Sequence, residues 1–254
     1  MRTIACEKWR RMSTGEQMLQ RLESARFRTC LAASVHFRDL PADDLDRIAG
    51  LGRIIALKDG QVLHRTGGKL HSLWVVLTGS LRISSIGDGE EFVYAVLGPG
   101  SFFGLGYVLS SKLLAVSASA YGATEVAAID GTRFLELLDK SPRLWRHVGG
   151  LLANRLSLAM LAVRDISSAP LDKRIVRRLL GQASGGRDLH PGGRVELRLT
   201  QSDLAAMLGA SRSKVNAELK RLENARMIEV GYRTIALVSL PKLHELAGQD
   251  VFAF

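Results

Sequence analysis

The chain has 254 residues, of which 46% are apolar and 24% are charged, and its formal net charge is +10 at pH 7. It has no run of eighteen apolar residues, no signal-peptide pattern and only two cysteines, which argues against a membrane protein and against a disulfide-rich secreted protein. We expect a cytoplasmic globular protein with no membrane partner and with enough residues for two domains.

The first 29 residues are rich in charge and are predicted to form an N-terminal extension with a short helix around Leu19 and Leu22. Residues 30–141 differ, because short apolar runs alternate there with turns that contain glycine. The runs are residues 73–77, 81–83 and 92–97, and the turns fall at Gly79, residues 87–89 and residues 98–100. Short strands at such close spacing predict an antiparallel sheet that is rolled or closed on itself.

A long helix is predicted over residues 142–168, starting at Ser141-Pro142. Its apolar residues recur at alternating spacings of four and three, the heptad pattern of a helix that pairs with its own copy. This seam comprises Trp145, Gly149, Leu152, Leu156, Ala159, Val163 and Ile166. A neighbouring ridge of Val148, Leu151 and Leu158 can cover the sheet at the same time. The alternative is one helix that packs only on its own domain.

A C-terminal domain is predicted at residues 169–254, because Ala169-Pro170 ends the long helix and forms a hinge. After the turn Pro191-Gly192-Gly193, residues 194–199 alternate polar and apolar side chains, as a strand does.

Two short amphipathic helices follow, joined at one glycine. Thr200 is placed to cap the first helix with Asp203 at the capping-box position, Gly209 supplies the turn, and Ser211 caps the second helix. Agreement of caps, turn and apolar spacing favours a DNA-reading helix-turn-helix over an ordinary helical hairpin.

The second of these helices is the predicted recognition helix. Val215, Leu219 and Leu222 must face inward, so the opposite face presents Arg212, Ser213, Asn216 and Lys220 to DNA. Residues 227–238 then predict a hairpin with its tip at Gly231-Tyr232-Arg233, which is the wing of a winged helix. From Pro170 onward, 14 Lys and Arg stand against 9 Asp and Glu, and this excess suits contacts with DNA phosphates.

A β-roll, a long helix, a hinge and a winged helix in this order resemble the Crp-Fnr superfamily, that of the cyclic-AMP receptor protein and the fumarate-nitrate regulator, over about residues 30–247. The resemblance rests on the helix-turn-helix and on three segments: G-Q-V-L-H-R-T-G-G from Gly60, V-V-L-T-G-S-L-R from Val75, and G-P-G-S-F-F-G-L from Gly98. It implies an α+β fold whose N-terminal roll is a cyclic-nucleotide-binding-like double-stranded β-helix. It also implies a homodimeric transcription regulator on a palindromic operator, with RNA polymerase as a partner if the protein is an activator.

The resemblance places Arg212 in the family's S-R-x-x-V segment, where it would contact guanine or a phosphate. Ser213 replaces the usual glutamate and Ala217 replaces a second arginine, so specificity would rest on Arg212, Ser213 and Asn216. Phosphate contacts are expected from Lys214, Lys220 and Arg233, with plain solvation as the alternative for the lysines. The complete set of predicted DNA-binding residues is Thr200, Gln201, Ser202, Ser211, Arg212, Ser213, Lys214, Asn216, Lys220 and Arg233.

The positions that hold cyclic AMP in the family have other residues here. Leu105 replaces the glutamate that binds the ribose, Leu114 and Ala115 replace the Arg-Ser pair that binds the phosphate, and Ala159 and Met160 replace the Thr-Ser pair that reads adenine. A buried phosphate without its guanidinium would cost several kcal/mol, so we predict that cyclic AMP does not control this protein.

Two interpretations of the equivalent cavity stay open. A pocket lined by Phe103, Leu105, Leu113, Leu114, Ala115, Ala159 and Met160 would suit an unknown apolar effector, or these side chains fill the roll and no effector is needed.

Other function classes need residue sets that differ from those in this chain. An iron-sulfur cluster needs four thiolates, and the chain offers only Cys6 and Cys30. Haem ligation would have to use one of the isolated histidines His36, His64 and His71, and isolated histidines are more commonly surface or turn residues. A cupin-like metal site at His64 and His71 lacks the ligand spacing that such sites use. We therefore predict no metal, no cofactor, no catalytic residue and no enzyme activity, with a metal-, haem- or redox-sensing roll as the alternative function.

Overall fold

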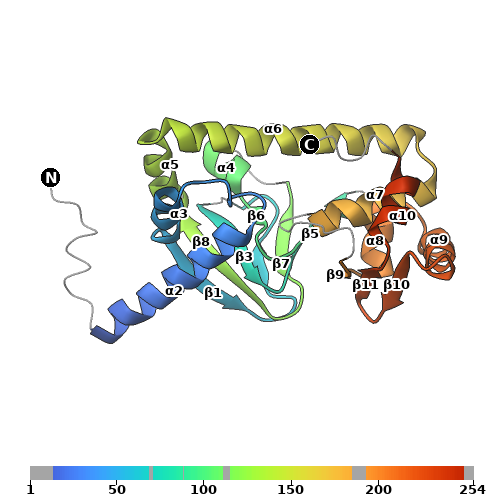
Figure 1. Cartoon of the computed structure of the whole chain (residues 1–254), viewed down its shortest axis with the longest axis horizontal. Coiled ribbons are helices and arrows are strands. Elements are labelled where there is room, and N and C mark those ends of the chain that lie inside the picture. The colour runs from blue at the N-terminus through green and yellow to red at the C-terminus, as the bar shows by residue number, and fades with distance from the viewer. Residues whose placement is uncertain (1–13, 69–70, 88, 111–114, 185–192, 249–254) are drawn as a thin grey trace.

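A computed structural model describes residues 14–68, 71–87, 89–110, 115–184 and 193–248 of the chain. Helix α6 (Pro142–Ser168) runs along the molecule, with a β-roll beneath its first half and a winged helix beneath its far end (Figure 1). The fold is thus a mixture of helix and sheet, as the sequence predicts.

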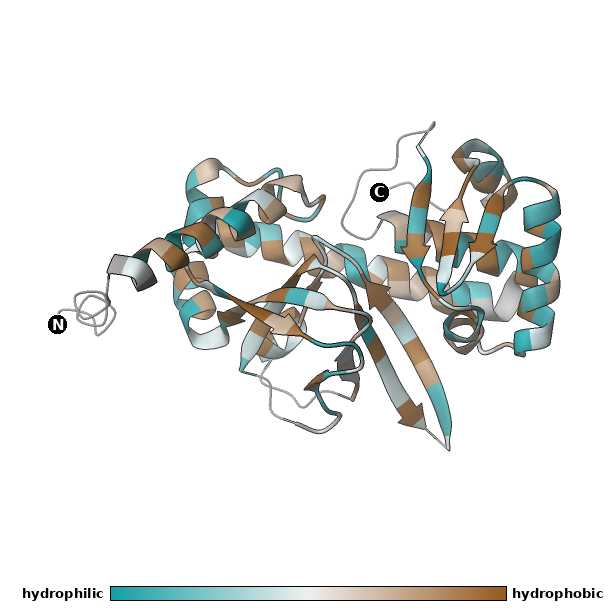
Figure 2. Ribbon diagram, turned by 90° about the horizontal axis from the view of Figure 1, so that it is seen from below, coloured by the Kyte–Doolittle hydropathy of each residue, from teal (hydrophilic) through white to brown (hydrophobic). Residues whose placement is uncertain are grey.

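The roll consists of two four-stranded antiparallel sheets. One has the order β1-β8-β3-β6, with β1 Gly52–Leu57, β8 Thr124–Asp130, β3 Ser72–Thr78 and β6 Phe102–Phe103. The other has the order β2-β7-β4-β5, with β2 Val62–His64, β7 Ser117–Ala120, β4 Leu81–Gly87 and β5 Glu90–Leu97. The three apolar runs expected to be strands lie in β3, β4 and β5. Apolar segments alternate with polar ones along the long strands of the roll (Figure 2).

Gly79, in the turn between β3 and β4, has a conformation that only glycine tolerates well. Its φ is +75°, and a Cβ there would lie 2.3 Å from the carbonyl oxygen of Ala123. The turn therefore packs directly on the segment that leads into β8.

Helices cover the outer side of the β1-β8-β3-β6 sheet. They are α2 (Thr14–Ala33), α3 (Ala42–Ala49), α4 (Leu105–Ser110) and α5 (Gly131–Asp139), and their apolar side chains form one core cluster with β3, β8 and the start of α6. Phe27 and Leu31 of α2 are fully buried there. From Glu23 onward α2 contacts the roll, where Arg26 pairs with Glu125. Its first turns project from the roll and expose Met18, Leu19 and Leu22 (Figure 1). Residues 1–13 lie outside the described part.

Helix α6 begins where the sequence predicts. The Ser141 hydroxyl accepts a hydrogen bond from the Leu144 amide at 3.3 Å, and Pro142 occupies the first turn. Val148 is buried and Leu151 packs against the roll, but Leu158 is 47% exposed. The predicted covering ridge therefore covers the roll only in its first half, because α6 continues past the last roll helix.

The winged helix contains α7 (Leu171–Ser184), β9 (Val195–Arg198), α8 (Gln201–Leu208), α9 (Arg212–Asn224), β10 (Ile228–Gly231), β11 (Thr234–Leu237) and α10 (Leu240–Ala247). Strands β10 and β11 form the wing, and β9 pairs with the other side of β11. Gly209 lies between α8 and α9 with φ +57°, the left-handed conformation that ends a helix. The predicted helix-turn-helix and hairpin are confirmed. Among the described residues, no helix has the length and apolar content needed to cross a membrane.

Candidate DNA-binding surface and effector site

Helix α9 presents one polar and one buried face. Val215, Leu219 and Leu222 are buried against the rest of the winged helix. Arg212 and Lys220 are exposed, and Asn216, midway between them and one turn from each, is half-buried. The spacing of four places these three side chains along one stripe, which can lie against base edges and phosphates.

The start of α9 adds further polar groups. Ser211 caps the helix by accepting a hydrogen bond from the Lys214 amide at 3.4 Å, and its hydroxyl lies 3.2 Å from that of Ser213. Ser213 and Lys214 are exposed. Within the described residues, no carboxylate forms an ion pair with Arg212, Lys214 or Lys220, so these cations can neutralise phosphates.

The first turn of α8 exposes fewer polar side chains for contact with DNA than the first turn of α9 does. The Thr200 hydroxyl accepts from the Asp203 amide at 3.0 Å and donates to the Asp203 carboxylate at 2.6 Å, so both of its roles serve the capping box. Gln201 is half-buried, and Ser202 is exposed. Of the three candidates on this turn, Ser202 is the one that faces solvent.

Arg233, at the tip of the wing, contacts the roll. Its guanidinium lies 3.4 Å from an Asp59 carboxylate oxygen and 4.5 Å from the centre of the Tyr121 ring. Asp59 also accepts a 2.7 Å hydrogen bond from the Gly122 amide, which together with Arg233 holds the pKa of that carboxyl below its usual value. Tyr232 beside it is 93% exposed and was not predicted as a contact residue. A phosphate at the wing would compete with Asp59 for this guanidinium.

The roll and the winged helix share a polar contact at Asp203. Its carboxylate accepts a hydrogen bond from Arg82 at 2.8 Å and another from the Tyr121 hydroxyl at 3.0 Å. Arg82 also pairs with both carboxylate oxygens of Glu91, at 2.5 and 2.8 Å. Next to this group, Val93 of β5 is buried among the apolar residues of the winged helix.

Two of the described residues predicted to line an effector pocket, Phe103 and Leu105, lie in different core clusters. Phe103 stacks on Trp74 inside the roll, with ring centres 5.9 Å apart, whereas Leu105 is buried in the separate cluster under the outer helices. Gly104 between them has φ +98°, and this turn of the backbone sends the two side chains to different cores. Ala115, Ala159 and Met160 are exposed, and Leu113 and Leu114 lie outside the described residues.

The candidate metal and redox residues are also separate. Within the described part of the chain, no three His, Cys, Asp or Glu side chains gather in a way that could hold a metal ion. His36 lies against the Phe102 ring, and burial, with Arg155 and His147 nearby, lowers its pKa to about 4. His64 is buried, with its pKa lowered by burial, and His71 is exposed.

Of the two cysteines, Cys30 is half-buried, and its thiol lies 3.4 Å from the Val76 carbonyl oxygen. Burial raises the pKa of this thiol, which disfavours the reactive thiolate. Cys6 lies outside the described residues.

Two domain families match the sequence. A cyclic nucleotide-binding domain matches residues 54–141, and a Crp-like helix-turn-helix domain matches residues 173–246. Together with the roll and the winged helix, these matches define a DNA-binding transcription regulator with an N-terminal domain of the cyclic nucleotide-binding fold. The chain belongs to the Crp-Fnr family, whose members are transcription regulators and not enzymes.

Relatives of known function span most of the chain. The "cAMP-activated global transcriptional regulator CRP" of Pasteurella multocida is 28% identical over 178 residues, which are 69% of this chain and 85% of that protein. The "HTH-type transcriptional regulator Cmr" of Mycobacterium tuberculosis is 26% identical over 198 residues, 78% of each protein.

Solved structures share the fold at low identity. The c-di-GMP responsive global regulator CLP of Xanthomonas campestris has a TM-score of 0.59 at 24% identity and covers 78% of this chain and all of its own. FixK2 of Bradyrhizobium japonicum has a TM-score of 0.65 at 20% identity, with 78% of this chain and 98% of its own covered. At these identities the likeness defines the fold alone.

Proposed function

We propose that the protein is a cytoplasmic homodimer that binds a palindromic operator, with α6 as the dimer helix and α9 as the recognition helix. The observation that carries the proposal is the apolar seam on α6. Leu156 and Val163 are 63% and 66% exposed in the single chain, although large aliphatic side chains in one stripe normally find a partner. Gly149 and Ala159 on the same stripe leave room for a second helix to approach.

A parallel pair of α6 helices would hold two winged helices on the same side. The two copies of α9 could then enter successive major grooves, about 34 Å apart along the duplex. Arg212, Ser213 and Asn216 would read base edges, while Lys214, Lys220, Ser202 and, after release from Asp59, Arg233 would contact the backbone. On this proposal, residues 30–141 form the sensor domain, residues 142–168 the dimer helix and residues 169–254 the DNA-binding domain.

Control by cyclic AMP is not part of the proposal. Leu105 stands at the ribose position, and Leu114 and Ala115 stand at the phosphate position, so neither group of the ligand would find its polar partner. Trp74 and Phe103 occupy the interior of the roll, which favours a roll filled by its own side chains over one that holds an apolar effector.

Selection of bound genomic fragments with the purified full chain tests the proposal, with and without cell-extract metabolites. We expect an inverted repeat whose half-site centres lie about 10–10.5 base pairs or a multiple apart. Enrichment of an unrepeated half-site, or of no sequence at all, would contradict it. The metabolite arm shows whether any effector changes the binding.

A further inference from the structure

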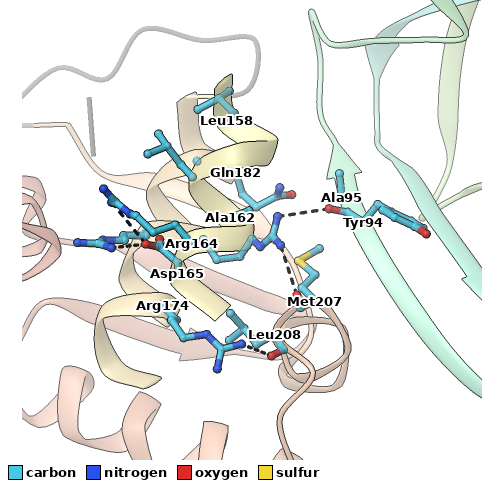
Figure 3. Close-up of a pocket in the computed structure, with 14 residues that line it drawn as sticks. Tyr94, Ala95, Leu158, Ala162, Arg164, Asp165, Arg174, Gln182, Met207 and Leu208 are labelled. Carbon is cyan, nitrogen blue, oxygen red and sulfur yellow. Dashed lines mark hydrogen bonds and ion pairs between the residues drawn. The ribbon is translucent and has the colours of Figure 1, made fainter. Parts of the chain in front are cut away.

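A pocket of about 250 Å³ lies at the hinge, where α6, α7, β5 and the end of α8 meet (Figure 3). We name it the hinge pocket. Its walls come from both sides of the junction, with Leu158 and Leu161 from α6, Arg174 and Arg178 from α7, and Met207 from α8. It is separate from the interior of the roll.

One wall of the hinge pocket is strongly basic. Arg174 and Arg178 lie four residues apart on α7, and Arg174 points toward Leu208 at the end of α8 (Figure 3). Arg174 donates to the Leu208 carbonyl oxygen, and Arg178 donates to those of Met207 at 3.3 Å and Tyr94 at 3.4 Å. These partners are neutral. Among the described residues, no carboxylate forms an ion pair with either guanidinium.

The carboxylate in the pocket, that of Asp165, already forms ion pairs. Asp165 pairs with Arg177 at 2.5 Å and with Arg164 at 3.6 Å, so it serves two other arginines. The pocket therefore holds four arginines and one aspartate. Burial, and the nearby charge of Arg174, lower the pKa of Arg178. A bound anion would offset both effects, because it stabilises the charged guanidinium.

Another part of the pocket wall is apolar. Leu161, Ala162, Met207 and Leu208 contribute hydrocarbon, and Leu158 extends it toward the opening with 47% of its surface exposed. An inorganic anion could use the arginines but would leave this wall in contact with water. A neutral apolar molecule could cover the wall but would leave the arginines with carbonyl partners only.

We propose that the hinge pocket binds a small anionic amphiphile, a molecule with one carboxylate, sulfonate or phosphate group and an apolar chain or ring. The anion would lie on Arg174 and Arg178, which suit bidentate recognition, and the apolar part on Leu158 and Leu161. The pocket is lined by the roll, the dimer helix and the helix-turn-helix. A bound molecule would therefore affect the position of the helix-turn-helix relative to the roll. That last consequence rests on the proposed function, whereas binding itself does not.

The test measures binding of 8-anilino-1-naphthalenesulfonate, an anionic aromatic probe, to the full chain by its fluorescence. We expect octanoate to displace the probe and 1-octanol at the same concentration not to, because only the acid carries the charge. Arg178→Met should raise the Kd of the probe about tenfold, the loss of one charge-assisted hydrogen bond. Ile86→Gln removes an apolar side chain that is 78% exposed outside the pocket and should leave the Kd unchanged.

A second variant covers the case in which Arg178→Met does not fold. Leu158→Glu alters an exposed side chain at the opening and should weaken the probe to a similar degree by repulsion. Equal displacement by octanol, an unchanged Kd in the folded pocket variants, or loss of binding in Ile86→Gln would overturn the proposal. Operator binding of the same preparations is measured separately, so a failure of the proposed function is distinguished from a failure of the pocket.

Discussion

Arg82 and Asp203 are 121 residues apart in sequence, yet the Arg82 guanidinium donates a 2.8 Å hydrogen bond to the Asp203 carboxylate across the junction of the two domains. The same carboxylate closes the capping box of α8 with Thr200. One aspartate therefore both starts the helix-turn-helix and attaches it to the roll.

Removing the arginine should destabilise the docked winged helix. Arg82→Met leaves a largely buried carboxylate with one charged partner fewer, at a cost of about 1.5–3 kcal/mol in the free energy of unfolding. Urea titration followed by far-UV circular dichroism measures it. Arg65→Met, at an exposed loop position, is the control and should change little. Equal stability of the two variants would mean that the ion pair contributes nothing.

Acid should weaken the same contact. Burial opposes ionisation of Asp203, but hydrogen bonds from Thr200 and Arg82 outweigh it and hold the pKa of Asp203 below its usual value. A carboxyl with a lowered pKa stabilises the folded state above its unfolded pKa of about 3.9, and this contribution is lost as pH falls through the folded pKa. Between pH 6 and pH 3, Asp203→Asn should therefore lose less stability than the wild type. A parallel fall of both curves would contradict the assignment.

The turn at Gly79 should tolerate no side chain. Gly79→Ala combines a positive φ with a Cβ at 2.3 Å from a backbone oxygen, and we expect a loss of at least about 1–3 kcal/mol. Gly60→Ala has a similar φ of +72° with nothing within 4 Å of the Cβ, so it measures the conformational cost alone. A thermal melt compares the two. Equal losses would show that the close approach has no effect.

Base-reading and phosphate-binding residues should separate by salt dependence. Arg212→Ala and Asn216→Ala are expected to cost about 1–3 kcal/mol on the selected operator and little on unrelated duplexes. Lys220→Ala should weaken binding to every duplex and reduce the slope of log K against log salt by about 1. Fluorescence anisotropy at several salt concentrations measures both. A uniform loss in Arg212→Ala would reassign that residue to the backbone.

Cyclic nucleotides should not bind in the roll. Isothermal calorimetry of the wild type with cyclic AMP and cyclic GMP is expected to give no heat of binding at micromolar ligand, because Leu105 cannot accept from a ribose hydroxyl. Micromolar affinity for either nucleotide would show that other residues replace the missing partners.

Local pattern predicts much of this structure. The helix-turn-helix, the wing, three strands of the roll and the start of α6 follow from caps, glycines and periodicity, because each depends on residues a few positions apart. Helix α2 is longer than the segment indicated by Leu19 and Leu22, since its buried anchors, Phe27 and Leu31, lie near its end and its first turns expose Met18 and Leu19.

Contacts between segments that are far apart in the sequence do not follow from local pattern. Asp203 has the sequence pattern of a capping residue, and nothing near it predicts Arg82 or Tyr121. Arg233 is a reasonable phosphate ligand by position, but its contact with Asp59 depends on how the two domains dock. Phe103 and Leu105 look like neighbours in a pocket, yet the backbone turn at Gly104 separates them. Arg174 and Arg178 of the hinge pocket are about thirty residues from the end of α8 in sequence, and they contact it only in the folded chain.

The oligomeric state on DNA tests the central claim most directly. Sedimentation velocity of the protein with a fluorescent duplex of the selected operator should give two protomers per duplex for the wild type. Leu156→Glu places a charge in the apolar seam and should abolish the two-protomer complex at the same concentration, whereas Asn154→Glu, an exposed position of α6 off the seam, should retain it. One protomer per duplex in the wild type, or an undiminished two-protomer complex in Leu156→Glu, would contradict a dimer built on α6.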